Sequence, residues 1–543
     1  MKKKYIIGGI VVCVGIAAWI GVYALENRTE KAVAGALASV PAQAQEIRYS
    51  LLNNTLLLKG VTYDVSEENV KRKGSVEQVE IKGFNPACLS VSAAAYDPDA
   101  LPVVAQSMTA TGISDDIGFG DLQIAQKIDE ISVSGWHQRL GVLLERFQKH
   151  RDEASFYEEM YRYRLDGMAF RGMRSLISMP DMPSPISLDM EEMGLAESAR
   201  APRGDEKVAP FSVYLSGMRF GAKGSTGRVS GELQRLDIKD VLLPDPFVMA
   251  ELVRINKKMD ATDLDSETGM DDFDEQIIAM SSLLQKNYEN KLLFSRFGMQ
   301  GFRFMVDEAN PQAGEPFVAV RMKSLDYRMG LSSGQYTYAA TLDALQLNMA
   351  ELRSNEVVRK YAPDGFTLNA NSESVVGDAK ITGRGRYDLV GLGALEGDMT
   401  LTGNIRDLRR LASMADLTID PSDLLQSIQL QKMNLKYHDS GLTAMAIELI
   451  AKEDGQSPES LLEAIFQSLR EMSQIPAKNA QQLGAALTEL FTLPGEFGMS
   501  YEPVTPVSLM ELVSMIMIDP GSVPVTFSSK QGTKPLTDYL AKP

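Results

Sequence analysis

Cysteine and histidine are scarce in this chain, with two cysteines and three histidines among 543 residues. The cysteines are Cys13 and Cys88, and Cys13 lies inside an apolar run near the amino terminus. A single cysteine in the rest of the chain excludes an intrachain disulfide framework. The histidines His137, His150 and His438 are far apart or lack the spacing of metal ligands. The sequence therefore predicts no disulfide scaffold, no metal site and no cofactor.

Excess positive charge is also absent, since the formal net charge is −17 and the isoelectric point is near 4.9. Attraction to nucleic-acid phosphates needs a basic surface, so a nucleic-acid partner is not expected. The acidic balance is explained by solubility. With 44% hydrophobic residues the chain can bury a large core, and its length predicts several domains.

The amino terminus predicts a membrane anchor. "MKKK" precedes the charge-free run "YIIGGIVVCVGIAAWIGVYAL" at 5–25, which as a helix would span roughly 30 Å, enough to cross a bilayer. Lysines at positions 2–4 favour a cytoplasmic tail at 1–4 and a translocated remainder, beginning with a stalk at 26–45. We therefore expect a single-pass protein of a bacterial inner membrane, with its carboxyl-terminal bulk in the periplasm.

Cleavage of a signal peptide is the competing interpretation of this terminus. The "AQA" at 42–44 has the form of a cleavage site, but the charged "ENRTEK" separates it from the apolar run, which is longer than a usual signal core. We favour an uncleaved anchor, and cleavage stays open.

The stretch "IRYSLLNNTLLLKGVTY" at 47–63 predicts a β-hairpin. Apolar residues alternate with others on both sides of Asn53 and Asn54, and asparagine tolerates the positive φ of a tight turn.

The second half of this hairpin belongs to a recurring pattern: apolar, any residue, apolar, polar, glycine, apolar. An unbroken strand would place the last apolar residue on the opposite face, so a glycine-centred bulge with positive φ is expected to keep it on the core side. The copies are LLLKGV at 56–61, VEIKGF at 79–84, ISVSGW at 131–136, MAFRGM at 168–173, VYLSGM at 213–218 and FGMQGF at 297–302, with the near-copy LDIKDV at 236–241 carrying Asp240 in place of glycine.

These patterns predict an α+β fold, in which a single amino-terminal transmembrane helix precedes a β-rich body of antiparallel, bulged strands with inserted helices. Alternation between 301 and 349 predicts a meander, and "DP" at 420 and "SP" at 457 are typical helix starts. The expected divisions are a β-hairpin and helix domain at 46–177, a proline-rich linker at 178–210, a β-meander domain at 211–403 with a helical insertion at 246–297, and a helical and β region at 404–543.

Three motifs that could carry chemistry have simpler explanations. "GLSSG" at 330–334 matches a hydrolase pattern, but strand-like alternation on both sides indicates a hairpin turn. "GLGALEG" at 391–397 has the wrong spacing for a dinucleotide fingerprint. The acidic run at 260–275 has its glycine one place late for a calcium loop. We therefore expect no catalytic residues and no enzyme activity, although a hydrolase site invisible to patterns stays open.

The anchor, the strands "LLNNTLLLKGVTYD" and "GSVEQVEIKGF", and the segment 493–527 resemble the AsmA-like proteins of bacterial envelopes. The resemblance implies a role in envelope integrity and a long twisted β-groove that carries phospholipid. It implies no catalytic residues. The predicted helices at 246–297 and in the carboxyl-terminal quarter depart from that pattern and put a continuous conduit in doubt.

The expected function is support of envelope assembly or integrity by binding or transferring lipid along an apolar β face. Such a face must be covered by the protein's own helices or by something apolar from outside. The alternative is a scaffold that binds other envelope proteins. The candidate lipid-facing residues are Val79, Ile81, Phe84, Phe302, Phe304 and Val306. The expected partners are the membrane through 5–25, and phospholipid or another envelope protein.

Overall fold

The computed structural model describes most of the chain beyond the amino terminus. The described residues are 42–50, 53–67, 70–84, 103–137, 164–180, 182–197, 210–224, 227–242, 246–261, 273, 275–283, 291–308, 317–412, 420–518 and 520–540. The expected tail, the expected anchor at 5–25 and most of the expected stalk lie outside them. Among the helices of the described ranges, none is both long and apolar enough to cross a membrane.

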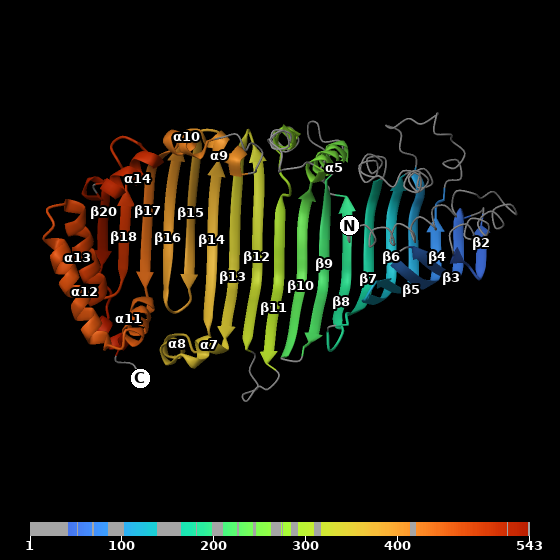
Figure 1. The fold of residues 1–543 in the computed structure, drawn as a ribbon, viewed down its shortest axis with the longest axis horizontal. Coiled ribbons are helices and arrows are strands. Elements are labelled where there is room, and N and C mark those ends of the chain that lie inside the picture. Colours follow the sequence, from blue (N-terminus) through green and yellow to red (C-terminus); the bar gives the residue numbers. More distant parts are fainter. Residues whose placement is uncertain are drawn as a thin grey trace. The chain divides into compact units, whose positions relative to one another are not determined.

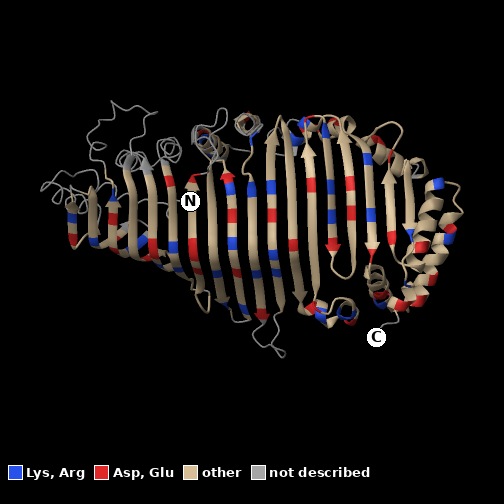
Figure 2. Ribbon diagram, turned by 180° about the vertical axis from the view of Figure 1, so that it is seen from behind, with Lys and Arg blue, Asp and Glu red and all other residues tan. Residues whose placement is uncertain are grey.

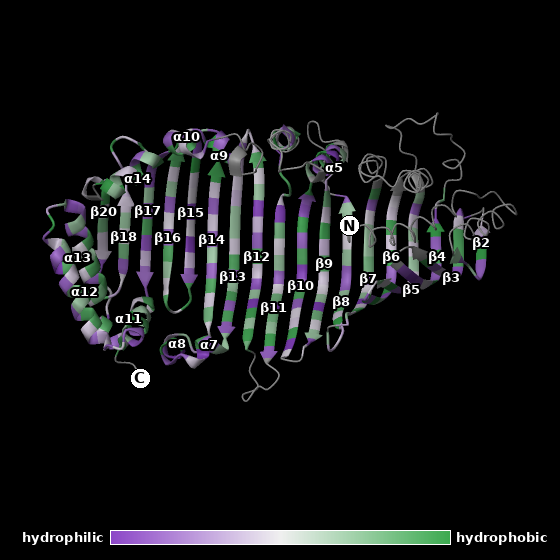
Figure 3. Ribbon diagram, viewed as in Figure 1, coloured by the Kyte–Doolittle hydropathy of each residue, from purple (hydrophilic) through white to green (hydrophobic). Residues whose placement is uncertain are grey.

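The chain divides into two units, residues 1–287 and 288–543, and each is built mainly of antiparallel strands (Figure 1). The fold is therefore predominantly β with inserted helices, which confirms the antiparallel part of the prediction. Hydrophobic and hydrophilic residues alternate along the strands (Figure 3), as expected for sheets that bury one face.

The first unit is a meander in which each strand from β2 to β10 pairs with the next, while β1 pairs with β3 beside β2. Its strands are β1 (Ala42–Gln43), β2 (Glu46–Ser50), β3 (Thr55–Glu67), β4 (Val70–Lys82), β5 (Val103–Phe119), β6 (Leu122–His137), β7 (Arg164–Ser178), β8 (Ile186–Glu197), β9 (Phe211–Lys223) and β10 (Gly227–Val241).

The predicted first hairpin is confirmed. Ser50 pairs with Thr55 across the β2–β3 turn, and Asn54 has a φ of 46°. Of the predicted 246–297 insertion, α5 (Pro246–Ala261) and residues 275–283 are helical, whereas residues 291–295 are not. Its last residues, however, already belong to β11 (Arg296–Glu308).

The linker predicted at 178–210 is wrong for its central part, because β8 lies there and pairs with both β7 and β9. Ile186, Leu188 and Met190 alternate along β8, and Met193 and Leu195 resume the alternation. The prolines that suggested a linker precede or follow this strand.

The second unit continues as a meander from β11 to β18, after which β17 also pairs with β19 and β18 with β20. Its further strands are β12 (Val318–Ser332), β13 (Gln335–Met349), β14 (Phe366–Val376), β15 (Lys380–Leu389), β16 (Gly393–Thr402), β17 (Gln429–Asp439), β18 (Glu496–Tyr501), β19 (Val507–Ser508) and β20 (Val525–Lys530). The predicted 301–349 meander is confirmed.

Helices of the second unit lie at strand ends and beside β20 (Figure 1). They are α7 (Ala350–Ser354), α8 (Glu356–Tyr361), α9 (Ile405–Ala412), α10 (Pro421–Ser427), α11 (Leu442–Glu453), α12 (Pro458–Ser473), α13 (Lys478–Thr492), α14 (Leu509–Ile518) and α15 (Leu536–Leu540). The predicted starts of α10 and α12 are confirmed, since Asp420 and Ser457 cap them and a proline follows each cap.

The predicted division at 403 does not separate two bodies. β16 pairs with β17 along ten residue pairs, so the 404–543 region shares the sheet of the meander before it. The boundary between units falls instead at 287/288, inside the expected 211–403 domain. Local patterns identify strands, but which strands share a sheet depends on long-range pairing.

The recurring glycine has the same positive-φ conformation in every copy, and we call this local change of the strand the step. Gly60, Gly83, Gly135, Gly172, Gly217 and Gly301 all have φ between 55° and 64°, and Asp240 in the near-copy has 54°. The sequence pattern missed two members, Gly112 at 61° and Ala344 at 50°. Leu56, Leu58, Val61 and Tyr63 are all buried on one face, so the step at Gly60 keeps the apolar side chains together as predicted.

At Asp240 and Ala344 the step is a bulge, because the register shifts by one residue between Ile238 and Val241 and between Leu342 and Leu345. At Gly60 it is not a bulge with one extra residue on a single strand. Lys59 pairs with Gln78 and Val61 with Val76, so the register is unchanged across Gly60 and the opposing Glu77. The alternation of side chains between the two faces of the sheet therefore shifts by one residue at Gly60 on β3 and at the opposing Glu77 on β4. The register places the corresponding residues of β3 to β10 opposite one another in a row across the sheet. They are Gly60, Glu77, Gly112, Asp129, Gly172, Glu191, Gly217 and Gln234.

The two units bury their cores differently. In the first unit, the inward side chains of β3 to β7 form one cluster, in which Leu56 is 0% and Ile81 is 1% exposed. In the second unit, the buried clusters lie where helices pack against strand ends, around Leu392, Ala444, Ile405 and Leu430. The middle of the second sheet has few fully buried residues.

Candidate apolar binding face

One face of the second unit's sheet is apolar across its strands, and we call it the apolar face. The register carries it from strand to strand: Phe302 pairs with Met322, which pairs with Leu345, which pairs with Leu368. Farther along, the same face carries Ile381, Tyr387, Leu389, Leu395, Met399, Leu401, Met433, Leu435, Tyr437, Phe497, Met499 and Phe527.

The steps at Gly301 and Ala344 keep the apolar side chains of β11 and β13 on the apolar face along the whole length of each strand. On β11, Met299 and Phe302 lie on either side of the glycine and face the same side of the sheet. Their partners on β12 are Leu325 and Met322. Ala344 donates its backbone N–H to Asn369 Oδ1 at 2.8 Å, so a side chain of the next strand satisfies the donor that the step turns out of the ladder.

The centre of the apolar face is exposed to solvent. Tyr387 on β15 is 49% exposed, and Leu395 and Met399 on β16 are each 38% exposed. Large apolar side chains at the middle of a wide sheet are usually covered by a second layer. Together these three form the exposed centre of the apolar face.

Small side chains lie beside the exposed centre in a strip that crosses β13 to β16. The members of this small-residue strip are Ala340, Ser372, Ser374, Gly383, Gly385 and Gly397. A Cβ built on Gly383 would meet two atoms within 4 Å, Glu373 O and Ser374 Cβ, each at 3.8 Å and both on β14. Space above Gly383 is therefore open, whereas a Cβ built on Gly397 would lie 2.8 Å from Asn434 O.

An aromatic ladder lies at one end of the apolar face, formed by Phe294 just before β11 and by tyrosines of β12 and β13. The rings of Phe294 and Tyr327 are 6.0 Å apart, those of Tyr327 and Tyr338 are 6.4 Å apart, and those of Tyr336 and Tyr338 stack at 6.3 Å. The Arg409 guanidinium of α9 lies 4.8 Å from the centre of the Tyr336 ring. Burial raises the pKa of Tyr327 and is also the main cause of the raised pKa of Tyr338, so both phenols are neutral at physiological pH.

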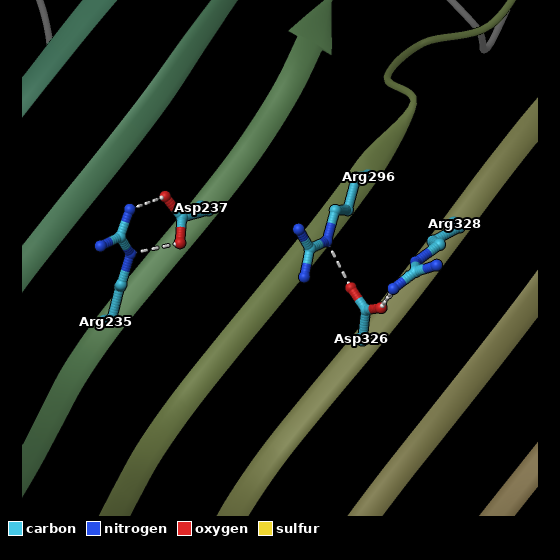
Figure 4. Close-up of polar contacts among 5 residues, drawn as sticks. All are labelled: Arg235, Asp237, Arg296, Asp326 and Arg328. Carbon is cyan, nitrogen blue, oxygen red and sulfur yellow. Dashed lines mark hydrogen bonds and ion pairs between the residues drawn. The ribbon is translucent and has the colours of Figure 1, made fainter.

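Charged residues recur along the strands (Figure 2). On the opposite face of the second unit's sheet they form cross-strand ion pairs. Asp326 on β12 accepts hydrogen bonds from Arg296 Nε at 2.5 Å and Arg328 Nε at 2.7 Å (Figure 4). Burial alone would raise the pKa of Asp326, but the hydrogen bonds and charges of the two arginines outweigh it and hold that pKa below its ordinary value. A similar pair joins Arg235 and Asp237 on β10 of the first unit.

His438 belongs to this polar face and lies between two carboxylates. Its Nε2 is 3.2 Å from Glu396 Oε1 and its Nδ1 is 3.5 Å from Glu496 Oε2. The hydrogen bond with His438 is the main cause of the lowered pKa of Glu396. Within the described ranges, no group of histidine, cysteine, aspartate and glutamate side chains is arranged to hold a metal ion. The three side chains form a polar network on the polar face.

The six candidate lipid-facing residues fall into two environments. Val79, Ile81 and Phe84 belong to the buried cluster of the first unit and are 7%, 1% and 2% exposed. Phe302, Phe304 and Val306 lie half-buried on the apolar face of the second unit. Contact of either set with lipid stays a prediction, and in this conformation the second set is the more accessible.

Sequence patterns missed the exposed centre and the small-residue strip. The exposed centre, and Gly383, Gly385 and Gly397 of the strip, come from "KITGRGRYDL" at 380–389 and "LEGDMTLTGN" at 395–404, whose glycines give no indication of the face that they share. Elsewhere the predicted hairpin turn is confirmed, since Ser333 and Gly334 have φ of 50° and 76° in the β12–β13 hairpin, so "GLSSG" is a turn. In "GLGALEG", Gly391 with a φ of 78° and Leu392 lie in a turn, and the rest belongs to β16.

Comparison with known families gives one match in this unit. A family model described as "Uncharacterized protein" matches residues 386–530, a segment that begins within β15 and ends with β20. Comparison with curated proteins gave no match. Neither finding shows the AsmA-like family, so that resemblance stays a prediction.

Proposed function

We propose that the protein binds phospholipid, with the acyl chains lying on the apolar face of the second unit. The observation that carries this proposal is the exposed centre, Tyr387, Leu395 and Met399, beside the open space above Gly383 in the small-residue strip. Exposed apolar patches in the middle of a sheet are typical of ligand or partner sites. Acyl chains fit such a surface because they need no directional hydrogen bonds.

The energetics favour a flexible apolar ligand. Each methylene removed from water contributes about 0.8 kcal/mol, so several methylenes on the strip would give useful affinity after the cost of immobilising the chain. The polar face cannot bind in this way, because its cross-strand carboxylates and cations are already paired, as Glu373 is with Arg384 and Glu396 with Arg386. Binding is therefore expected on one side of the sheet.

The proposed cellular role is support of envelope assembly or integrity, by binding or transferring lipid at a bacterial inner membrane. The charge-free run at 5–25 supports an anchor there, with the body in the periplasm. The AsmA-like resemblance supports the same role. The rival proposal is a scaffold on which the apolar face binds another envelope protein.

The test is mass spectrometry of the full-length protein extracted in mild detergent, comparing wild type with Gly383→Leu. The leucine would fill the strip, and it should be tolerated because a Cβ at this position has room. Thr382→Leu is the matched control, since residue 382 lies on the same strand and faces the opposite side.

The proposal expects phospholipid to copurify with wild type and Thr382→Leu, and to be depleted from Gly383→Leu. Equal lipid content in all three proteins would overturn binding on the apolar face. A stoichiometric protein partner without phospholipid would favour the scaffold.

A further inference from the structure

Helix α14 is apolar on both sides, although one side is already packed. Leu509, Leu512 and Met515 pack against the cluster of Leu430 and Tyr501 at the end of β17 and β18. The Ser508 hydroxyl accepts a hydrogen bond from the Glu511 N–H at 3.1 Å and so caps the helix start. The packed side fixes α14 in place, and its remaining apolar residues are not needed for that packing.

The outer side of α14 is strongly exposed. Val513 and Ile516 are 49% and 54% exposed, and Met517 and Ile518 at the end of the helix are 80% and 84% exposed. Val504, in the loop before α14, is fully exposed at 103%. Nothing in the described residues covers these side chains. Four neighbouring apolar side chains exposed on one short helix need a specific explanation.

The form and charge of this surface point to a bilayer. Residues 512–518 contain no charged side chain, as the apolar side of a helix at a membrane interface requires. The side chains project outward, whereas a peptide-binding site would be concave. The nearest charged residues in sequence before 512 are Glu502 and Glu511, which would repel anionic headgroups.

A second copy of the chain is a weaker candidate for this surface. A ten-residue helix is about 15 Å long, and one exposed side of it offers an area on the order of a few hundred Å². A stable protein interface buries more than about 1,000 Å² in total. Self-association through α14 alone would therefore be weak.

We infer that the outer side of α14, from Val513 to Ile518, inserts into the interfacial region of a zwitterionic bilayer. This inference concerns a different surface from the apolar face and does not depend on lipid binding there. It adds a contact between the carboxyl-terminal end of the protein and a membrane, beyond the anchor expected at 5–25.

The test uses the full-length chain reconstituted into phosphatidylcholine vesicles, with Cys13→Ser and Cys88→Ser as background. An environment-sensitive fluorophore is attached through Met517→Cys or Ile516→Cys, and through Glu463→Cys on the exposed side of α12 as the control. Vesicles with a nitroxide on the lipid acyl chains report contact of the label with the bilayer interior.

The inference expects loss of emission at positions 517 and 516 and no loss at 463. It also expects less quenching at 517 when part of the phosphatidylcholine is replaced by phosphatidylglycerol, because of Glu502 and Glu511. Equal quenching at 517 and 463 would overturn it. A label at 517 that is shielded from water, is not quenched by nitroxide lipid and responds to protein density would identify a second copy instead.

Discussion

A Cβ atom built on Gly172 would lie 2.0 Å from Asp129 Oδ2 on the neighbouring strand. Gly172 also has a φ of 62°, so two independent constraints favour glycine at this position. The same relationship recurs where a Cβ on Gly112 would lie 2.3 Å from Glu77 Cδ and one on Gly217 would lie 2.3 Å from Glu191 Cδ. An acidic side chain of one strand lies against the glycine of the next.

This relationship predicts that Gly172→Ala lowers the stability of the first unit more than Gly120→Ala does. Gly120 also has a positive φ, 55°, but nothing lies within 4 Å of its Cβ direction. The control should therefore cost about 1 kcal/mol for conformation alone, and Gly172→Ala should cost about 1–3 kcal/mol more because the carboxylate must move. Urea unfolding followed by circular dichroism measures the difference.

Asp129→Ala should recover part of the loss in the double variant, since it removes the side chain that blocks the new methyl group. An additive double variant would contradict the steric account.

The ion pair of Arg72 and Asp115 predicts a second stability effect. Arg72 Nε lies 2.9 Å from Asp115 Oδ1, the Asp115 side chain is 4% exposed, and the guanidinium lies 5.5 Å from the centre of the Tyr63 ring. Arg72→Met leaves a buried carboxylate without its cation and should cost about 3–5 kcal/mol. The double variant Arg72→Met/Asp115→Leu should be much more stable than Arg72→Met in the same urea experiment. If both variants lose the same stability, the pair is not coupled.

The lowered pKa of Asp326 predicts a loss of stability in acid. Burial opposes the shift, but the arginines at 296 and 328 outweigh it. A carboxyl group whose folded pKa is below its unfolded value stabilises the fold at pH values above the unfolded pKa, and this contribution is lost as pH falls through the folded pKa. Because the arginines are partly exposed, the effect should be at most about 1 kcal/mol.

The measurement is the unfolding midpoint of wild type and Asp326→Asn between pH 7 and pH 3. The difference between the two proteins should be largest near neutrality and should shrink below about pH 4, the unperturbed range of aspartate. A difference that is constant with pH would show that the ionised carboxylate is not responsible.

Lipid binding on the apolar face predicts opposite results for two neighbouring substitutions on β16. Met399→Glu places a charge in the exposed centre, where it should keep the fold but abolish binding of a fluorescent phospholipid. Thr400→Glu places the same charge on the polar face and should leave binding unchanged. Phe304→Glu should also weaken binding, but Phe304 is half-buried, so its folding must be checked by circular dichroism. Equal binding by Met399→Glu and Thr400→Glu would argue against this face.

Local patterns in the sequence predicted many of the strands and steps and two helix starts, because each depends on neighbouring residues. They did not predict β8, which fell within the expected linker. The glycine of "VEIKGF" carries its own conformational requirement, and Asp240 was recognised as a variant of it. Ala344 was missed because its positive φ depends on Asn369 from the next strand, which accepts its N–H. The matched phase change at Glu77 was missed for the same reason, since it follows from the pairing of β4 with β3.

The candidate site depends on long-range pairing even more strongly. Ser374, Gly383 and Gly397 belong to three different strands, and nothing in the residues around them indicates a shared site. They lie in one strip because β14 pairs with β15 and β15 with β16 in this register. The exposure of Tyr387 depends on which helices fail to cover it, which no local pattern encodes. By contrast, Phe302 and Phe304 were placed on the apolar face from alternation alone.

Photo-crosslinking of the full-length protein tests the central claim most directly. A phosphatidylcholine analogue with a diazirine at the end of one acyl chain is bound and activated, and the modified residues are mapped by mass spectrometry. The account predicts modification at Tyr387, Leu395 and Met399, and its loss in Gly383→Leu but not in Thr382→Leu. Modification confined to residues outside the apolar face, or unchanged by Gly383→Leu, would contradict it.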